Sequence, residues 1–144
     1  MMKNLFRTIA CIFFLAIGNA QAEVVISDAW VRANAPGQSV GAAYMTLKSP
    51  QDSNLFHVES PAAGSVEIHS MSVTNGVMKM RALETLPLQA GKPEKLAPGG
   101  FHLMLFDLKK PLKAGEQATF TLSFKDKTGK ITHQDVVLPI QEAN

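Results

Sequence analysis

Short apolar segments alternate with turn-forming residues along this chain, from residue 23 almost to its end. Every gap between the segments contains Gly or Pro, the residues that supply the backbone angles of tight turns. No long amphipathic helix pattern interrupts them. In 144 residues this pattern is typical of one all-β domain, a sandwich or barrel. We expect strands at residues 25–33, 41–47, 55–60, 65–73, 77–83, 102–108, 117–124 and 131–139.

Residues 1–22 have the pattern of a cleaved secretory signal peptide. Lys3 and Arg7 come first, an apolar run follows, and the sequence AQA at residues 20–22 supplies a small-residue cleavage motif. The run is shorter than the roughly 20 apolar residues that a membrane crossing needs. We therefore expect residues 23–144 to form the mature domain, exported to the periplasm and without stable membrane insertion.

Cleavage at this site changes the chemistry that the domain has available. It removes Cys11, the only cysteine, so no thiol, disulfide or cysteine nucleophile remains. It also leaves twelve basic and twelve acidic residues, and this balance does not favour a nucleic acid as partner. Ser70 neighbours His69, but adjacent residues on a strand point to opposite faces. No catalytic arrangement is recognisable, and we expect a monomeric protein that is not an enzyme.

A β-hairpin is predicted around the dipeptide Asn75-Gly76. Asn-Gly is the preferred centre of a two-residue type I′ turn, because both residues tolerate positive φ. This turn sets Met71 opposite Met80 and His69 opposite Ala82. With side chains alternating between faces, one face then holds His69, Met71, Val73, Met78 and Met80. Met and Val are also common in β cores, so the hairpin alone leaves two interpretations open, a core face and a soft-metal site.

A second pair of donors, His102 and Met104, strengthens the metal interpretation. The two residues are two apart in a predicted strand, so their side chains share a face. Four of the five methionines of residues 23–144 lie in this strand and the hairpin. Because a Gly99-Gly100 turn precedes the strand, we expect His102 at an open strand end, where a metal ion could enter.

The donor types favour copper in its reduced state. Thioether sulfur is a soft, neutral donor that suits Cu(I), and neutral imidazole is a stronger donor that also binds copper. Zinc sites use thiolate, imidazole and carboxylate instead. Without cysteine, the thiolate-containing electron-transfer site of blue copper proteins cannot form. Two imidazoles with one or two thioethers would hold Cu(I) and still allow its exchange.

The donor spacing and its surroundings resemble one known family. From His69 the sequence has ten residues, Met80, twenty-one residues, and then His102-Leu103-Met104. The segments DAWVRANAPGQSVGAAYMTLKS, NGVMKMR and LAPGGFHLMLFDLKKPLKAGE are similar to the same family. These are the periplasmic copper chaperones of the PCu(A)C family, and the resemblance covers nearly all of the mature chain. It implies a cupredoxin-like Greek-key β-barrel or sandwich.

The resemblance also implies a metal site and a role. It implies four Cu(I) ligands, which are His69, Met80, His102 and Met104. Met71 and Met78 are further thioethers close by and are accessory candidates. The implied role is delivery of Cu(I) to the CuA domain of cytochrome c oxidase, beside a Sco-type thiol protein. Two alternatives stay open. One is a periplasmic copper-sequestering or resistance protein with the same site, and the other is a metal-free β-sandwich assembly module.

Other conspicuous residues receive ordinary structural interpretations. His57 and His133 have no donor partner nearby in the sequence, and we expect them at the surface or rim. Trp30 and Tyr44 are expected to fill the core, because large aromatic side chains dominate such interiors.

We predict that the exported protein begins at Glu23, because the AQA motif ends at Ala22. N-terminal sequencing of the protein from the cell envelope checks this. A retained Met1, or a mature chain that starts at a lipid-modified Cys11, would contradict the prediction.

Overall fold

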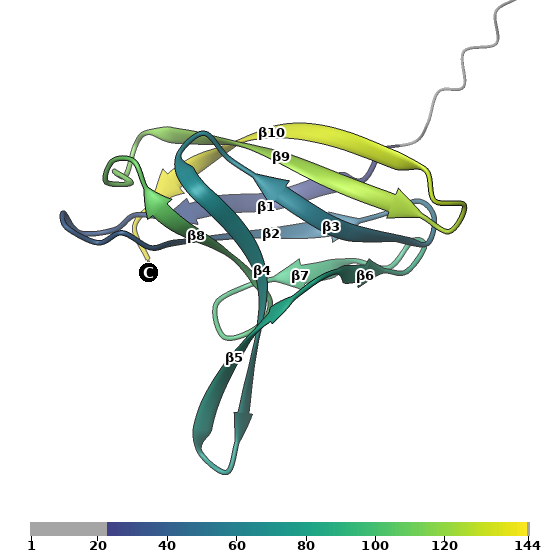
Figure 1. Cartoon of the computed structure of the whole chain (residues 1–144), viewed down its shortest axis with the longest axis horizontal. Coiled ribbons are helices and arrows are strands. Elements are labelled where there is room, and N and C mark those ends of the chain that lie inside the picture. The colour runs from purple at the N-terminus through teal and green to yellow at the C-terminus, as the bar shows by residue number, and fades with distance from the viewer. Residues whose placement is uncertain (1–22, 144) are drawn as a thin grey trace, which may run out of the picture.

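Ten β-strands make up the regular structure of residues 23–143, the part of the chain that this computed structural model describes (Figure 1). The predicted signal peptide therefore lies outside the described residues. The strands are β1 (Val25–Arg32), β2 (Gly41–Lys48), β3 (Ser53–Glu59), β4 (Ala63–Thr74), β5 (Val77–Leu83), β6 (Leu86–Leu88), β7 (Glu94–Leu96), β8 (His102–Leu108), β9 (Gln117–Asp126) and β10 (Ile131–Gln141).

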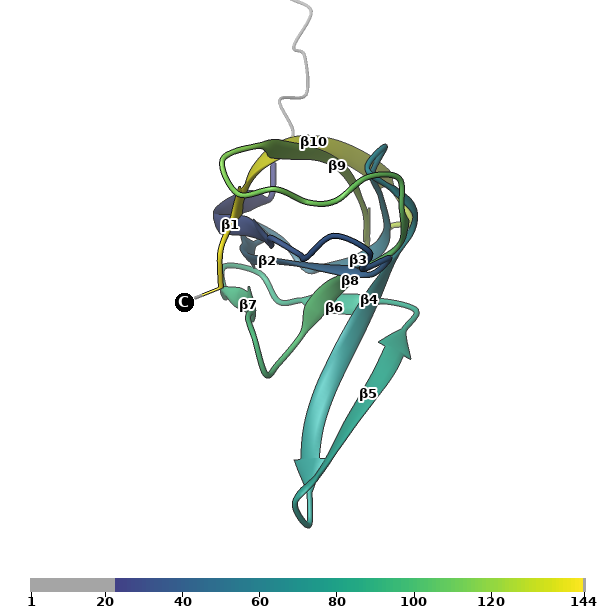
Figure 2. The same ribbon diagram turned by 90° about the vertical axis from the view of Figure 1, so that its left-hand side faces the viewer.

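The strands form one curled sheet that wraps round a central core, as the end-on view of Figure 2 shows. The hydrogen-bonded order is β5-β4-β8-β2-β1-β10-β9-β3-β6. In addition, β7 pairs with residues 45–47 of β2. A parallel pairing of β1 with β10 joins the two halves of this path. The path is open, with β5 and β6 at its ends. The predicted all-β, single-domain fold is confirmed.

Alternation along each strand sends every second side chain into the core. On β8, Leu103 and Leu105 are fully buried, and β4 contributes Ala63 and Ile68 to the core. The opposite half contributes Phe120 and Leu122 from β9. The cluster is purely hydrophobic, as expected for a domain that is held together by apolar burial.

Tyr44 is buried, with 5% of its surface exposed, and Trp30 is half-buried, but neither belongs to the main hydrophobic cluster. The expectation that both fill the core is therefore met only in part. The two residues pair across β1 and β2, and their rings stack with centroids 4.8 Å apart. The next pair in the register, Val31 and Ala43, is fully buried on the core side. Alternation therefore places both aromatic rings on the outer face, where the Arg32 guanidinium lies 5.5 Å from the Tyr44 ring centroid.

The predicted hairpin forms with the predicted register. Asn75 and Gly76 have φ of 52° and 75°, as a type I′ turn requires. Met71 pairs with Met80, and His69 pairs with Ala82. The hairpin of β4 and β5 extends well away from the curled sheet (Figures 1 and 2).

The apolar face of the hairpin is open to solvent, so the core interpretation of this face was wrong. Val73 is 65% exposed and Met78 is 64% exposed. The reason is geometric, because β5 is an edge strand that pairs only with β4, and the hairpin extends past the rest of the sheet.

The predicted strands all exist, with ends that shift by one or two residues. Residues 77–83 and 102–108 match β5 and β8. The expected set lacked β6 and β7, which have only three residues each and lie in a polar, Pro-containing stretch. Among residues 23–143, no helix reaches the length and apolarity that a bilayer crossing requires.

We predict that the metal-free protein unfolds cooperatively and that its stability resides in the core. Phe120→Ala removes a fully buried ring and should lower the free energy of unfolding by about 3–5 kcal/mol. Val77→Ala, at a side chain that is 55% exposed on the hairpin, should change it by no more than about 0.5 kcal/mol. Urea unfolding of both variants checks this. Equal losses, or a metal-free chain already unfolded at room temperature, would contradict it.

Candidate metal centre

The pairing of β4 with β8 brings the two candidate histidines together. His69 lies directly opposite His102 in the antiparallel register, although the two are far apart in the sequence. Their ring centroids are 5.6 Å apart, and the rings are tilted by 50°. Two imidazoles at this separation can approach one ion placed between them.

Both histidines point to the outer face of the sheet, opposite the core. Ile68 and Leu103, their strand neighbours, are buried in the core, so alternation turns the imidazoles the other way. The His69 side chain is 12% exposed, and His102 is only 4% exposed. His102 is the first residue of β8 as predicted, but it is covered and does not form an open strand end.

His102 is oriented by the turn that precedes it. Its Nδ1 lies 3.0 Å from the carbonyl oxygen of Gly100. A carbonyl oxygen only accepts hydrogen bonds, so Nδ1 carries the proton and donates it. The lone pair of the neutral ring is then on Nε2. Histidines that bind metals commonly donate their second ring N–H to a carbonyl or carboxylate in this way.

His69 is oriented by a carboxylate on its own strand. Its Nε2 lies 2.7 Å from Oε2 of Glu67. The other ring nitrogen, Nδ1, is buried and has no hydrogen-bond partner among residues 23–143. Buried polar atoms are nearly always paired, so an unpaired one calls for an explanation. A metal ion is the ligand that this nitrogen, with its lone pair, is suited to bind.

The methionines of the predicted site lie around the histidine pair on the same face. Met104 pairs with Glu67 and is a diagonal neighbour of His69. Met80 pairs with Met71 on the side of the hairpin tip and is also a diagonal neighbour of His69. Diagonal neighbours have Cα atoms about 7–8 Å apart, within reach of long side chains.

The register does not separate Met71 from Met80 as a donor. Met71 follows His69 on β4 and is half-buried, whereas Met80 is 50% exposed. Met78 pairs with Val73 one step nearer the tip, so it is not brought beside either histidine. The structure thus places the four predicted ligands on one face, with Met71 as close to the histidine row as Met80.

Few hard donors accompany these groups. Within residues 23–143, no three or more His, Cys, Asp or Glu side chains are grouped so as to hold a metal ion. Burial raises the pKa of the Tyr44 phenol above its ordinary value, and the nearby Arg32 guanidinium partly offsets this rise. The phenol therefore stays neutral on this face. The donors around the two imidazoles are chiefly thioethers, which suit a soft ion.

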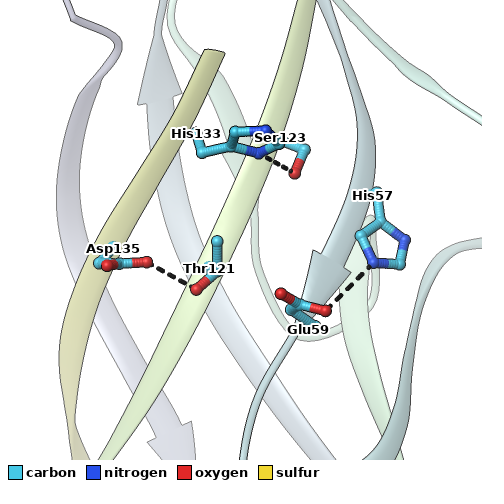
Figure 3. Close-up of polar contacts among 6 residues, drawn as sticks. All are labelled: His57, Glu59, Thr121, Ser123, His133 and Asp135. Carbon is cyan, nitrogen blue, oxygen red and sulfur yellow. Dashed lines mark hydrogen bonds and ion pairs between the residues drawn. The ribbon is translucent and has the colours of Figure 1, made fainter. Parts of the chain in front are cut away.

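The other two histidines lie on β3 and β10, at the surface as predicted (Figure 3). His57 on β3 is 56% exposed and lies 3.6 Å from a Glu59 oxygen. His133 on β10 lies 2.8 Å from the Ser123 hydroxyl of β9. His133 is far from the His69–His102 pair in the strand order. His57 is distant in that order as well, but it lines a pocket together with Glu67, because β3 and β4 contact each other in the curled sheet.

Three groups that contact the histidines have no role predicted from the sequence. They are the Glu67 carboxylate, the Gly100 carbonyl, and the ring of Phe106, whose centroid is 6.0 Å from that of His69. The alternation of side chains along a strand places Glu67 on the same face as His69 and Phe106 on the same face as His102. The Gly100 contact has no sequence signal, because any residue carries a backbone carbonyl.

Comparisons with known proteins agree with this fold. The sequence matches the LpqE-like family over residues 24–137. A relative named "Putative lipoprotein Lxx21020", from Leifsonia xyli subsp. xyli, is 37% identical over 106 residues. That match covers 72% of this chain and 63% of the relative's own length.

Two solved structures are similar to this one. A copper-bound PCuAC domain from PmoF2 has a TM-score of 0.67 at 23% identity, over 85% of this chain and 95% of that one. The Cu(I) form of DR1885 from Deinococcus radiodurans has a TM-score of 0.59 at 32% identity, over 88% and 83%. With the family match, these likenesses confirm the predicted relationship: the chain belongs to the LpqE-like family and has the fold of PCuAC domains.

Proposed function

We propose that this protein is a copper carrier that binds one Cu(I) ion per chain and delivers it to another protein. The observation that supports this most directly is the pair of opposed histidines, each with one ring nitrogen held by an oxygen acceptor. The other ring nitrogens, His69 Nδ1 and His102 Nε2, keep their lone pairs. We assign the ligands as His69, Met80, His102 and Met104.

The donor chemistry supports Cu(I) as the cargo. Neutral imidazole and thioether together prefer a soft monovalent ion to hard divalent cations. The similar DR1885 structure is a Cu(I) form, and its 32% identity to this chain supports the same cargo here. Met71 remains an alternative sulfur donor, because it lies as near to the histidine row as Met80.

Delivery fits the site better than storage. The described residues carry one compact group of soft donors, and all of these donors are neutral. A thiolate is the stronger soft ligand, so a recipient with cysteine ligands can draw Cu(I) from such a site. The CuA domain of cytochrome c oxidase is a recipient of this kind, and a Sco-type thiol protein is the accompanying partner. The delivery of Cu(I) to this recipient would take place in the periplasm, after export of the protein by the predicted signal peptide.

The exposed hairpin is a suitable place for such a transfer. Met80 is half exposed, and the more exposed Met78 and Val73 lie beyond it toward the tip. An ion bound beside Met80 would be accessible from the side on which the hairpin extends. Partner thiolates could then replace thioethers one at a time, while the buried histidines still hold the ion.

We predict that the histidines dominate Cu(I) affinity. His69→Ala or His102→Ala should weaken binding by at least about 100-fold, since removing a ligand should cost no less than removing its outer-shell support. His133→Ala is the matched control and should have no effect, because His133 lies on the far half of the sheet. Anaerobic competition with a colorimetric Cu(I) chelator checks this. Equal affinities for His102→Ala and His133→Ala would overturn the assignment.

We predict that deleting the gene lowers cytochrome c oxidase activity under copper limitation and that added copper partly restores it. The wild-type and His133→Ala genes should complement the deletion, and His102→Ala should not. Oxidase activity in membranes is the measurement. If activity stays normal and the cells become sensitive to excess copper, sequestration is the function. A purified protein that retains no Cu(I) would instead favour a metal-free assembly module.

A further inference from the structure

Glu67 and His69 form a close pair on β4 with unequal surroundings. The Glu67 side chain is 50% exposed, whereas the His69 side chain is 12% exposed. The carboxylate oxygen and the ring Nε2 are 2.7 Å apart, a short hydrogen bond. An ionised carboxylate only accepts, so Nε2 is the protonated nitrogen of the neutral ring.

This hydrogen bond decides which ring nitrogen is buried without a partner. With the proton on Nε2, the lone pair is on Nδ1, the atom that is buried and unpaired within residues 23–143. The reverse tautomer would leave Nε2 without a proton to donate to the carboxylate. It would also bury an N–H on Nδ1 with no acceptor, and such a group is rarely left unpaired.

His102 has the opposite arrangement. Its Nδ1 donates to the Gly100 carbonyl, so Nε2 keeps the lone pair. The two opposed rings thus carry their lone pairs on different nitrogens, Nδ1 of His69 and Nε2 of His102. This asymmetry comes from the acceptors and not from the histidines, since one acceptor is a side chain and the other is a backbone carbonyl.

A second His–Glu pair in the same protein shows that spacing alone does not create this effect. His57 and Glu59 are also two residues apart on one strand (Figure 3). Their nitrogen and oxygen are 3.6 Å apart, and the side chains are 56% and 67% exposed. Water competes for both groups there, so that pair cannot hold a ring in place.

We propose that Glu67 is a positioning residue of the metal site. It holds His69 with Nε2–H toward the carboxylate, so that Cu(I) is accepted by Nδ1 of His69 and by Nε2 of His102. Glu67 itself does not ligate the ion, because its contacting oxygen is occupied by the imidazole and is a hard donor. This inference rests on the proposed function for its metal, but its statement about the imidazole also holds for the metal-free protein.

The metal-free protein gives the first test. Two-bond 1H–15N spectra, recorded where the imidazoles are neutral, report which ring nitrogen carries the proton. His69 should be protonated on Nε2 and His102 on Nδ1. Glu67→Ala should move His69 to a mixture of tautomers, and Glu59→Ala, the matched control, should leave both rings unchanged. An unchanged His69 in Glu67→Ala, or a His69 that is protonated on Nδ1 in the wild type, would overturn the positioning role.

Metal affinity gives the second test. Glu67→Ala should weaken Cu(I) binding roughly 10- to 100-fold, the usual effect of losing such a support. Glu67→Gln should lose less, because its amide oxygen still accepts from Nε2, and Glu59→Ala should lose nothing. Unchanged binding by Glu67→Ala would overturn the proposal, since it would mean that the carboxylate does not support the site. Tighter binding would overturn it too, since it would mean that the carboxylate competes with the metal for Nε2.

The ligating atoms can be identified directly with Ag(I), a soft monovalent ion whose nuclei couple to 15N. Couplings should appear at His69 Nδ1 and His102 Nε2, and a coupling at His69 Nε2 would overturn the assignment. The two proposals remain separable. A wild-type protein that binds neither ion removes the copper function, while the tautomers of the metal-free protein still decide the role of Glu67.

Discussion

The antiparallel pairing of β4 with β8 is the interaction on which the candidate site depends. It sets His69 opposite His102, and the same ladder sets Ile68 opposite Leu103 on the other face. This single register therefore places core residues on one face of the two strands and the candidate metal donors on the other face. A slip of one residue would exchange the two faces, so the burial of the leucines also fixes the histidines in place.

This arrangement separates stability from metal binding. The core side of β8 holds Leu103 and Leu105, which are fully buried, and the donors lie on the outer side. The hairpin beyond the core adds an exposed surface that the fold does not need for its own packing. Such a design would let the proposed site lose its ion without loss of the fold, as the proposed carrier function requires. Any gain in stability from the ion would come from its preference for the native state.

Local patterns predicted local structure well. The Asn75-Gly76 turn determined the register of the hairpin, because the turn type leaves one pairing for its two strands. The alternation of His102 and Met104 likewise placed both side chains on one face. The pairing of β4 with β8 had no such signal, since the two strands are joined by a long connection that includes β5, β6 and β7. The donor types suggested that both histidines belong to one site, and the resemblance to a known family implied the same ligand set, but neither predicted that the two strands pair.

Errors arose where burial depends on distant parts of the chain. Tyr44 is buried but lies outside the main hydrophobic cluster, because the adjacent Ala43 faces the cluster, and composition does not decide between the two residues. The exposure of Met78 follows from the edge position of β5, which is a property of the whole sheet. The hydrogen bond from His102 to the Gly100 carbonyl involves a backbone atom and has no sequence signature.

X-ray absorption at the copper edge of the Cu(I)-loaded protein tests the central claim most directly. The account predicts a low-coordinate ion with both nitrogen and sulfur neighbours, and with the outer-shell scattering of imidazole rings. His102→Ala should lose part of the imidazole signal. A spectrum that contains only oxygen and nitrogen neighbours would contradict the site on the histidine and methionine face of β4, β5 and β8.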